Sequence, residues 1–235
     1  MPGTVYLIPT VLHEDEQALQ AIPAYIIEAV KNCTVFFVEN ERTARRFLKK
    51  IWRDMVIDGY QWHAIHKAEE EVQQAFITQL KQNKNIGIIS EAGCPGIADP
   101  GQILVEAAQQ MNATVHPLVG PSSILLALMA SGMNGQCFQF VGYLPIESSA
   151  RKKTIKELEE YSYKKNCTQI FIETPYRNNQ LINDVLNMCK AETKFCIAVD
   201  ITASTENIKT KTIKEWKQEV PELNKRLAIF LLLAN

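Results

Sequence analysis

Short apolar runs alternate with longer amphipathic stretches along the first half of the chain. Four runs have the length and the aliphatic side chains of buried strands, namely Thr4–Thr10, Thr34–Val38, Ile86–Ser90 and Thr114–Val119. Apolar positions at helical spacing predict helices at Asp15–Lys31, Glu41–Arg53, Lys67–Asn83, Pro100–Met111 and Ser122–Ala130. This alternation of strand and helix predicts a parallel sheet that is covered by helices.

The pattern changes after Ser131–Gly135, a turn-rich segment that reads SGMNG. Further strands are expected at Phe138–Tyr143, Thr168–Glu173, Phe195–Ile201 and Leu227–Leu233. Helices are expected at Arg151–Tyr161, at Gln180–Lys190 and around Trp216. Because the second half has its own set of strands, we predict two α/β lobes, residues 1–118 and 119–235.

The connection that follows the strand Ile86–Ser90 is long. It reads SEAGCPGIADPG from Ser90 to Gly101, whereas most strand-to-helix connections have about 2–6 residues. Asp99 is predicted to cap the next helix, with Pro100 in its first turn. The glycines would let the backbone approach a ligand without a Cβ in the way. On physical grounds alone, the stretch fits a ligand-binding loop and a purely structural loop equally well.

Two other connections, Val119–Ser123 and Glu173–Arg177, also follow predicted strands. Ligands of α/β proteins bind beyond the carboxyl ends of parallel strands, so these three loops together form the candidate site. The chain contains neither G-x-x-x-x-G-K-[ST] nor G-x-G-x-x-G, so the common motifs for nucleotide phosphates are absent.

Composition narrows the class of protein. Of the 235 residues, 46% are hydrophobic and 22% are charged, and no apolar run approaches the ~20 residues that span a bilayer. The first residues lack the basic start of a signal peptide. The six cysteines are scattered without a C-x-x-C pair, and the histidines show no metal spacing. We therefore expect a cytoplasmic protein without a metal site or a membrane span.

A net charge of −1 means that any nucleic-acid partner needs a local basic patch. The predicted helix Glu41–Arg53 gathers such cations, namely Arg42, Arg45, Arg46, Lys49, Lys50 and Arg53. A second group follows in the other lobe, at Arg151, Lys152, Lys153 and Lys156. These segments could bind phosphates. The alternative is a solvated helix face whose charges are balanced by acids elsewhere.

The loop Ser90–Gly101 resembles the S-D-A-G-x-P-x-I-S-D-P-G signature of the ribosomal RNA small subunit methyltransferase I family, within the tetrapyrrole methylase superfamily. Further segments resemble other motifs of that family in the same order, namely GTVYLIPT, VENERTARRFL, VGPSSILLALMASGM with FQFVGYLP, RKKTIKELEE and FIETPYRNNQLINDVL. The resemblance extends over nearly the whole chain. It implies a two-lobed tetrapyrrole methylase-like α/β fold with the cofactor cleft between the lobes.

The resemblance also implies a cofactor, S-adenosyl-L-methionine, a substrate, ribosomal RNA or the small ribosomal subunit, and a homodimer. The residues expected to bind the cofactor are Pro9, Ser90, Glu91, Ala92, Gly93, Gly96, Ile97, Ala98, Asp99, Gly120, Ser122, Ser123, Thr174 and Thr202. Those expected to bind RNA are Arg42, Arg45, Arg46, Lys49, Arg151 and Lys152.

Methyl transfer to a hydroxyl gains from a general base, by about 10²–10⁴-fold. The candidate groups are Glu39, Glu91, Glu173, Asp99 and His13. Glu39 and Glu173 are preferred because each ends a predicted strand, although a capping or ion-paired acid is common at such places.

The chain departs from the family pattern at several points. The family's G-N-L-x-D is replaced by VLHEDE at Val11–Glu16, and its R-E-x-T-K by VDITAST at Val199–Thr205. Three functions are therefore kept: 2′-O-ribose methylation of small-subunit ribosomal RNA, methylation of a tetrapyrrole or another small molecule, and cofactor binding without catalysis. The basic helix and the F-x-E-T-P-x-R segment favour the first.

Overall fold

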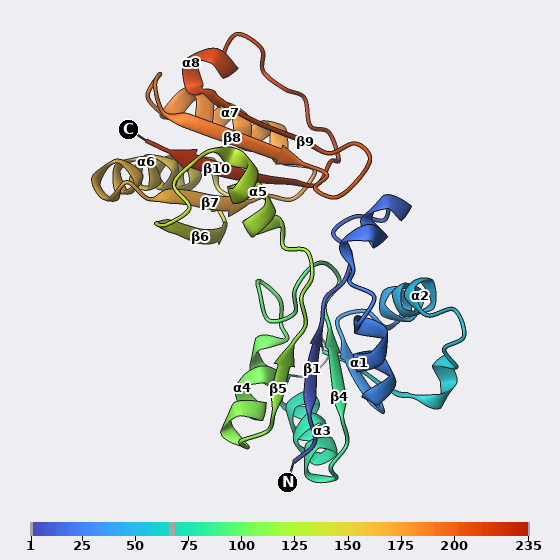
Figure 1. Ribbon diagram of the computed structural model, residues 1–235. Coiled ribbons are helices and arrows are strands. Elements are labelled where there is room, and N and C mark those ends of the chain that lie inside the picture. Colours follow the sequence, from blue (N-terminus) through green and yellow to red (C-terminus); the bar gives the residue numbers. More distant parts are fainter. Residues whose placement is uncertain (1, 66–68, 235) are drawn as a thin grey trace. The chain divides into compact units, whose positions relative to one another are not determined.

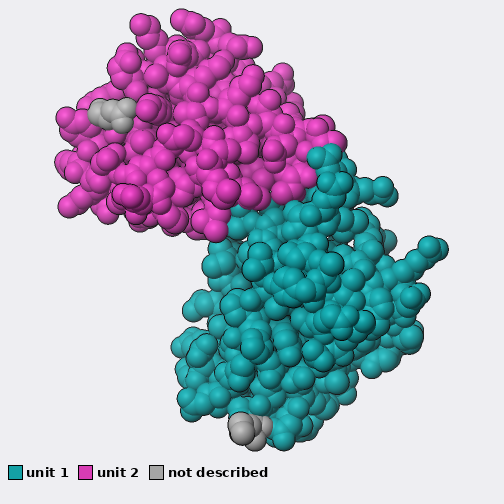
Figure 2. Space-filling model, in the orientation of Figure 1, with its two compact units in different colours: residues 1–122 teal, residues 123–235 magenta. Residues whose placement is uncertain are grey.

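The computed structural model describes residues 2–65 and 69–234. The chain forms two compact units, Met1–Ser122 and Ser123–Asn235 (Figure 2). Each unit is built around one five-stranded sheet, which confirms the predicted α/β class (Figure 1). Within the described residues, no helix is long and apolar enough to cross a membrane.

The sheet of the first unit is entirely parallel, as predicted. Its strands are β1 (Val5–Ile8), β2 (Val35–Val38), β3 (Gln61–Ala64), β4 (Ile86–Ile89) and β5 (Val115–Pro117). They lie in the order β3-β2-β4-β1-β5. The edge strand β3 was not predicted, because its sequence QWHA has no apolar alternation. In this order the central strands β4, β1 and β2 bring their carboxyl ends to one edge of the sheet.

Helices cover both faces of this sheet, and alternation along the strands explains why. Phe36 and Val38 pack with α1 (Ile26–Asn32) and α2 (Glu41–Ile51), whereas Val35 and Phe37 pack with α3 (Glu69–Lys81) and α4 (Gln102–Gln110). Successive side chains of a strand point to opposite faces, so a strand that is apolar throughout is buried on both sides. The unit is therefore a three-layer sandwich (Figure 1).

Two helices of this unit differ from their predicted limits. The prediction of one helix over Asp15–Lys31 was wrong, because a 3-10 helix, η1 (Glu16–Ala21), ends before Pro23 and α1 starts only at Ile26. Proline has no N–H to donate within a helix, which explains the break. The helix predicted at Lys67–Asn83 ends at Lys81, and its first two residues lie outside the described residues.

The sheet of the second unit is mixed. Its strands are β6 (Phe138–Tyr143), β7 (Thr168–Ile172), β8 (Lys194–Val199), β9 (Asn207–Thr212) and β10 (Ala228–Leu233). The order is β6-β7-β10-β8-β9, in which only β6 and β7 run parallel. The edge strand β9 was missed because its sequence NIKTKT is polar, and lysines are common on edge strands.

The helices of the second unit are α5 (Ser123–Ser131), α6 (Ser148–Lys165), α7 (Asn178–Met188) and the short α8 (Ile213–Trp216). The core joins α6, α7 and α8 to the sheet, with a stack of Phe171, Phe195 and Phe230 at its centre. Helix α5 packs against β9 and β10. Helix α6 begins earlier than predicted, because Glu147 caps it by accepting from the N–H groups of Ser149 and Ala150.

Candidate functional site

The long loop after β4 is tied to the end of β1 by hydrogen bonds. The N–H of Thr10 donates to the carbonyl of Gly93 at 2.9 Å, and the Thr10 hydroxyl donates to the carbonyl of Ser90 at 3.2 Å. The Ser90 hydroxyl in turn donates to the Ala92 carbonyl at 3.3 Å. The loop is therefore a fixed surface beyond the carboxyl ends of neighbouring parallel strands.

Two glycines give the loop its shape. Gly93 and Gly96 have φ angles of +72° and +82°, a region that other residues rarely adopt. A Cβ at Gly93 would lie 3.1 Å from a methyl group of Leu12 and 3.2 Å from the Pro121 carbonyl oxygen, so the backbone packs tightly there. A Cβ at Gly96 would meet no atom of the described residues within 4 Å. The space beside Gly96, where a side chain would lie, is thus open.

Asp99 closes a turn within the loop. The prediction that it caps the next helix, α4, was wrong. The Oδ1 atom of Asp99 accepts from the N–H groups of Gly96 at 2.9 Å and Gly101 at 2.7 Å, and α4 begins only at Gln102. Burial raises the pKa of the Asp99 carboxyl above its ordinary value, and the two backbone donors partly oppose the rise. The side chain thus closes a turn that ends the loop before the helix starts.

The connection after β5 lies against the same loop. A Cβ at Gly120 would collide with the ring of Pro9, so these two predicted cofactor residues are in contact. The Cys94 thiol donates to the Pro121 carbonyl at 3.5 Å, and burial raises the pKa of this thiol. The structure therefore brings together the predicted residues that follow β1, β4 and β5.

Two acids are linked at the edge of this loop. Glu39 follows β2, and its Oε1 accepts from the N–H of Glu91 at 2.8 Å. The Thr43 hydroxyl of α2 donates to Oε1 of Glu91 at 3.3 Å. Glu39 thus fixes the start of the loop after β4. His13, another candidate base, accepts from the N–H of Asp15 at 3.1 Å.

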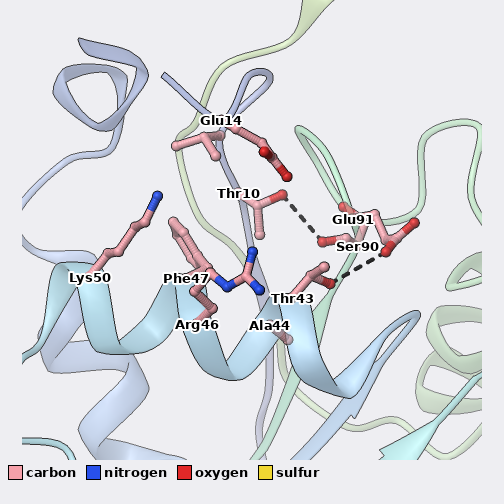
Figure 3. A pocket seen from close by; sticks show the side chains of 10 residues that line it. Thr10, Glu14, Thr43, Ala44, Arg46, Phe47, Lys50, Ser90 and Glu91 are labelled. Atoms are coloured by element: carbon pink, nitrogen blue, oxygen red, sulfur yellow. Dashed lines mark hydrogen bonds between the residues drawn. The ribbon is translucent and has the colours of Figure 1, made fainter. Parts of the chain in front are cut away.

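A pocket of about 160 Å³ opens between α2 and the ends of β1 and β4 (Figure 3). Its lining residues are Thr10, Val11, Glu14, Thr43, Ala44, Arg46, Phe47, Lys50, Ser90 and Glu91. Ser90 and Glu91 belong both to this pocket and to the predicted cofactor loop. Glu14, Thr43 and Phe47 were not predicted as site residues. The spacing of Thr43, Phe47 and Lys50 on one helix face was the signal that could have indicated them.

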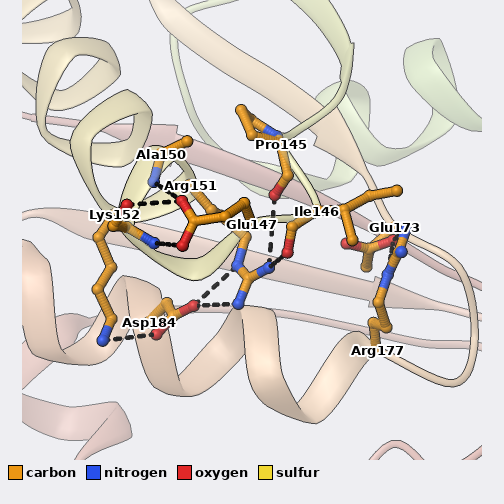
Figure 4. Close-up of polar contacts among 10 residues, drawn as sticks. Pro145, Ile146, Glu147, Ala150, Arg151, Lys152, Glu173, Arg177 and Asp184 are labelled. Carbon is orange, nitrogen blue, oxygen red and sulfur yellow. Dashed lines mark hydrogen bonds and ion pairs between the residues drawn. The ribbon is translucent and has the colours of Figure 1, made fainter.

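In the second unit, Glu173 directly follows β7 (Figure 4). Its side chain is only 1% exposed. Its Oε1 accepts from the Thr174 N–H at 2.6 Å and from two nitrogens of Arg177 at 2.6 and 3.0 Å. Its Oε2 is buried and has no hydrogen-bond partner among the described residues. Glu173 therefore holds Arg177 and keeps one carboxylate oxygen free.

Thr202, which follows β8, is in a strained position. Its φ angle of +73° is unusual for a β-branched residue. Its N–H donates to Glu206 at 2.7 Å, while its buried hydroxyl has no partner among the described residues. Strain of this kind is concentrated at functional sites.

The predicted RNA-binding cations fall into different environments. The prediction for Arg151 is corrected: its side chain is 1% exposed, pairs with Asp184 at 2.6 Å and donates to the Ile146 carbonyl at 2.7 Å (Figure 4). Lys152 lies 3.7 Å from the same Asp184 and is half-exposed. A buried, paired guanidinium cannot contact RNA, so Arg151 is a structural anchor of α6.

The cations of α2 also differ in whether neighbouring residues engage them. Arg45 pairs with Glu41 and stacks on Trp62, with 5.0 Å from its guanidinium carbon to the ring centroid. Lys49 donates to the Arg53 carbonyl at 2.8 Å. Arg42 is exposed, and Arg46 faces the pocket (Figure 3). In the described part of the chain, no group of three or more His, Cys, Asp or Glu side chains could hold a metal ion.

Solved structures with related folds include the methyltransferase CobJ, with a TM-score of 0.65 at 13% identity, covering 100% of this chain and 95% of that one. Uroporphyrin-III C-methyltransferase from Thermus thermophilus, complexed with S-adenyl homocysteine, has a TM-score of 0.58 at 12% identity, covering 98% and 97%. These similarities support the two-lobed α/β fold that was predicted.

Sequence relatives named "Ribosomal RNA small subunit methyltransferase I" are more similar. The protein from Buchnera aphidicola is 29% identical over 236 residues, which cover 98% of this chain and 78% of that protein. The protein from Vibrio cholerae is 34% identical over 147 residues, which cover 63% of this chain and 50% of that protein. The chain thus matches only half the length of the Vibrio relative.

The family described as Tetrapyrrole (Corrin/Porphyrin) Methylases matches residues 19–217. That range includes the loop after β4, the pocket residues of α2, and Glu173 and Thr202 of the second unit. The predicted family is confirmed: this chain belongs to the tetrapyrrole (corrin/porphyrin) methylases, and ribosomal RNA small subunit methyltransferases I are among its relatives.

Proposed function

We propose that this protein is an S-adenosylmethionine-dependent methyltransferase that methylates a ribose 2′-hydroxyl of small-subunit ribosomal RNA. The observation that carries the proposal is the loop Ser90–Gly101, which is fixed to β1 by hydrogen bonds and leaves the space beside Gly96 open. Membership of the methylase family supports the reaction. The names of the relatives support the substrate.

The chain's residues fit the cofactor. S-adenosylmethionine, when bound, supplies a methyl group made reactive by a positively charged sulfur. In the first unit, open space beside Gly96 lets a ligand approach the loop, whose Gly96 N–H is held by Asp99. In the second unit, the Thr202 hydroxyl has no partner among the described residues. A complex of a structurally similar methyltransferase with S-adenyl homocysteine agrees with this choice. Cofactor contacts by Ile97, Ala98, Ser122, Ser123 and Thr174 are part of the same proposal.

The protein's part in the reaction is to orient the two reactants, exclude water and accept a proton. Orientation alone can supply ~7–11 kcal/mol of the barrier. We retain Glu39 and Glu173 as the proposed proton acceptors. Glu173 has a buried oxygen without a partner among the described residues, and Glu39 is half-buried beside the loop. Both carboxylates are held in place by hydrogen bonds, which is what a positioned base requires.

The test combines cofactor binding with methyl transfer. Gly96→Val places a branched side chain where the ligand should approach, and we expect calorimetry to show at least tenfold weaker binding of S-adenosylhomocysteine. Gly132→Val is the matched control, because Gly132 also has a positive φ, +66°, and open space at its Cβ but lies in the turn after α5. Equal affinity in the two variants would remove the loop from the cofactor site.

The acceptor is tested with ribosomal subunits from cells that lack the protein. We expect the wild-type protein to transfer a labelled methyl group to small subunits or their RNA, at one mapped 2′-oxygen. Transfer to a tetrapyrrole without transfer to RNA would favour the small-molecule alternative. Cofactor binding without any transfer would favour a binding protein. The proposal includes action in the cytoplasm as a homodimer.

A further inference from the structure

The pocket beside the cofactor loop has one cationic wall. Arg46 and Lys50 lie one turn apart on the same face of α2, and both line the pocket (Figure 3). Both are exposed, and neither forms an ion pair with any described residue. Arg45, by contrast, is engaged by Glu41 and Trp62. Two unpaired cations at this spacing form a site for an anion.

The opposite wall is acidic. Glu14, which follows β1, is exposed and has no hydrogen bond or ion pair within the described residues. Glu91 follows β4, and one of its oxygens already accepts from Thr43. Between the walls, Val11, Ala44 and Phe47 give an apolar surface. The pocket therefore suits an occupant with one anionic group, an apolar body and hydrogen-bond donors.

A nucleotide has this combination of groups. Its phosphodiester carries one negative charge, its base is flat and largely apolar, and its sugar and base edges carry donors. A tetrapyrrole with several carboxylates fits poorly, because carboxylates beside Glu14 and Glu91 would repel.

We infer that this pocket holds the nucleotide that is methylated, with its phosphate on Arg46 and Lys50 and its donor groups facing Glu14. This inference rests on the proposed function and adds the residues that recognise the substrate. The pocket and the cofactor loop share Ser90 and Glu91, so a nucleotide seated here would lie next to the cofactor loop.

The first test compares two double variants of equal charge. Arg46→Ala with Lys50→Ala removes the cationic wall, whereas Lys81→Ala with Lys209→Ala removes two exposed cations that lie outside the pocket and outside the predicted RNA-binding segments. Each RNA phosphate contact contributes ~0.7–0.9 to the slope of log affinity against log salt. We expect the pocket variant to lose about 1.4–1.8 of this slope and to raise KM for small subunits at least tenfold.

The control variant should change KM less than threefold, and both variants should bind S-adenosylhomocysteine as the wild type does. If the control loses as much slope and raises KM as much as the pocket variant, RNA is attracted only by the overall charge of the protein, and the inference is wrong. Retention of slope and KM in the pocket variant would overturn it as well. In either case, methylation by the wild type would leave the proposed function standing.

A second probe distinguishes the occupant. Uroporphyrin III is titrated into the wild-type protein and the pocket variant, and we expect no saturable binding to either. Binding that needs Arg46 and Lys50 would assign the pocket to a polycarboxylate and overturn the nucleotide assignment. Failure of the wild type to methylate RNA at all would reject the proposed function, and the inference with it.

Discussion

Asp99 shows how one side chain can set the shape of a whole loop. Its carboxylate binds backbone N–H groups on both sides of the turn, at Gly96 and Gly101. The same burial that makes these hydrogen bonds strong makes the charge costly, so the pKa of the carboxyl is raised. A binding loop that depends on this residue should therefore respond to mild acid.

We predict that affinity for S-adenosylhomocysteine falls as the pH is lowered toward the raised pKa of Asp99, because protonation weakens the hydrogen bonds that close the loop. In Asp99→Asn this dependence should be absent, and affinity at neutral pH should be lower by about tenfold, equivalent to ~1.4 kcal/mol. Calorimetry of both proteins from pH 4.5 to 8 is the measurement. The same pH dependence in both would assign the effect to another group.

Protonation of Asp99 has the opposite effect on the free energy of unfolding from its effect on ligand affinity. A carboxyl whose pKa is higher in the folded state holds its proton more tightly there than in the unfolded chain. Its contribution to the free energy of unfolding therefore decreases as the pH rises through the interval between the ordinary and the raised pKa. Acid thus weakens the loop without weakening the fold through this residue.

Glu173 is a second buried acid, and its burial determines how much it contributes to the free energy of unfolding. Glu173→Gln should lower the free energy of unfolding by about 1–3 kcal/mol, because the charge-assisted hydrogen bonds to Arg177 and Thr174 are weakened. Glu157→Gln is the control, since its ion pair with Lys153 is exposed and should change stability by less than about 1 kcal/mol. Urea unfolding checks both. Equal losses would mean that the Glu173 pair is energetically no different from a surface pair.

At the scale of elements, the sequence predicted strands best where they are buried. Strands β1, β2 and β4 were predicted because apolar side chains fill both faces of a parallel sheet. Strands β3 and β9 were missed because their largely polar sequences, QWHA and NIKTKT, give no clear apolar pattern. Pairing with a neighbouring strand, which a sequence window does not contain, holds these strands in place.

The same limit applies to the candidate site. Glycine and proline made the loop after β4 conspicuous, and the resemblance to the family supplied its expected cofactor residues. Which cations are free could not be predicted, because it depends on contacts distant in sequence. Asp184 buries Arg151 from 33 residues away, and Trp62 engages Arg45 from the neighbouring strand. Charge density indicated a basic helix, but not which of its cations are engaged by neighbouring residues.

Arg151 connects α6 with α7 and with the segment before α6. We predict that it stabilises the fold and does not bind RNA. It links α6 to Asp184 of α7 and to the Pro145–Ile146 carbonyls before α6 (Figure 4). Arg151→Ala should lower the free energy of unfolding by about 3–5 kcal/mol, because Asp184 is left buried without its main partner. Lys153→Ala, on the exposed side of α6, should change it by less than about 1 kcal/mol.

Denaturant unfolding measures both variants of α6. If Arg151→Ala does not fold, Arg151→Lys keeps a cation and loses the two-pronged contact, so a smaller loss of stability is expected. The salt dependence of RNA binding by the folded Lys variant should equal that of the wild type. A reduced slope would contradict the structural role and restore Arg151 to the RNA-binding residues.

At the scale of the whole molecule, apolar side chains remain exposed on the second unit. Helix α5 buries Ala127 and Leu128 but leaves Leu125 51% and Met129 78% exposed. Tyr143, Ile146 and Tyr176 of the same unit are exposed as well. Contiguous exposed apolar surface commonly marks an interface between proteins. This exposure on α5 agrees with the homodimer that the resemblance to the family implies.

We therefore predict a solution mass of twice the 26.6 kDa of one chain at micromolar concentration, measured by light scattering. Leu125→Asp with Met129→Asp should shift the equilibrium to the monomer, because two charges would have to be buried in the interface. Val56→Asp, an exposed apolar residue of the first unit, is the control and should remain dimeric. A monomeric wild type would reject the dimer, whereas a dimeric double variant would place the interface away from α5. If the monomeric variant keeps cofactor affinity and loses methyl transfer, the dimer is needed for the acceptor and not for the cofactor.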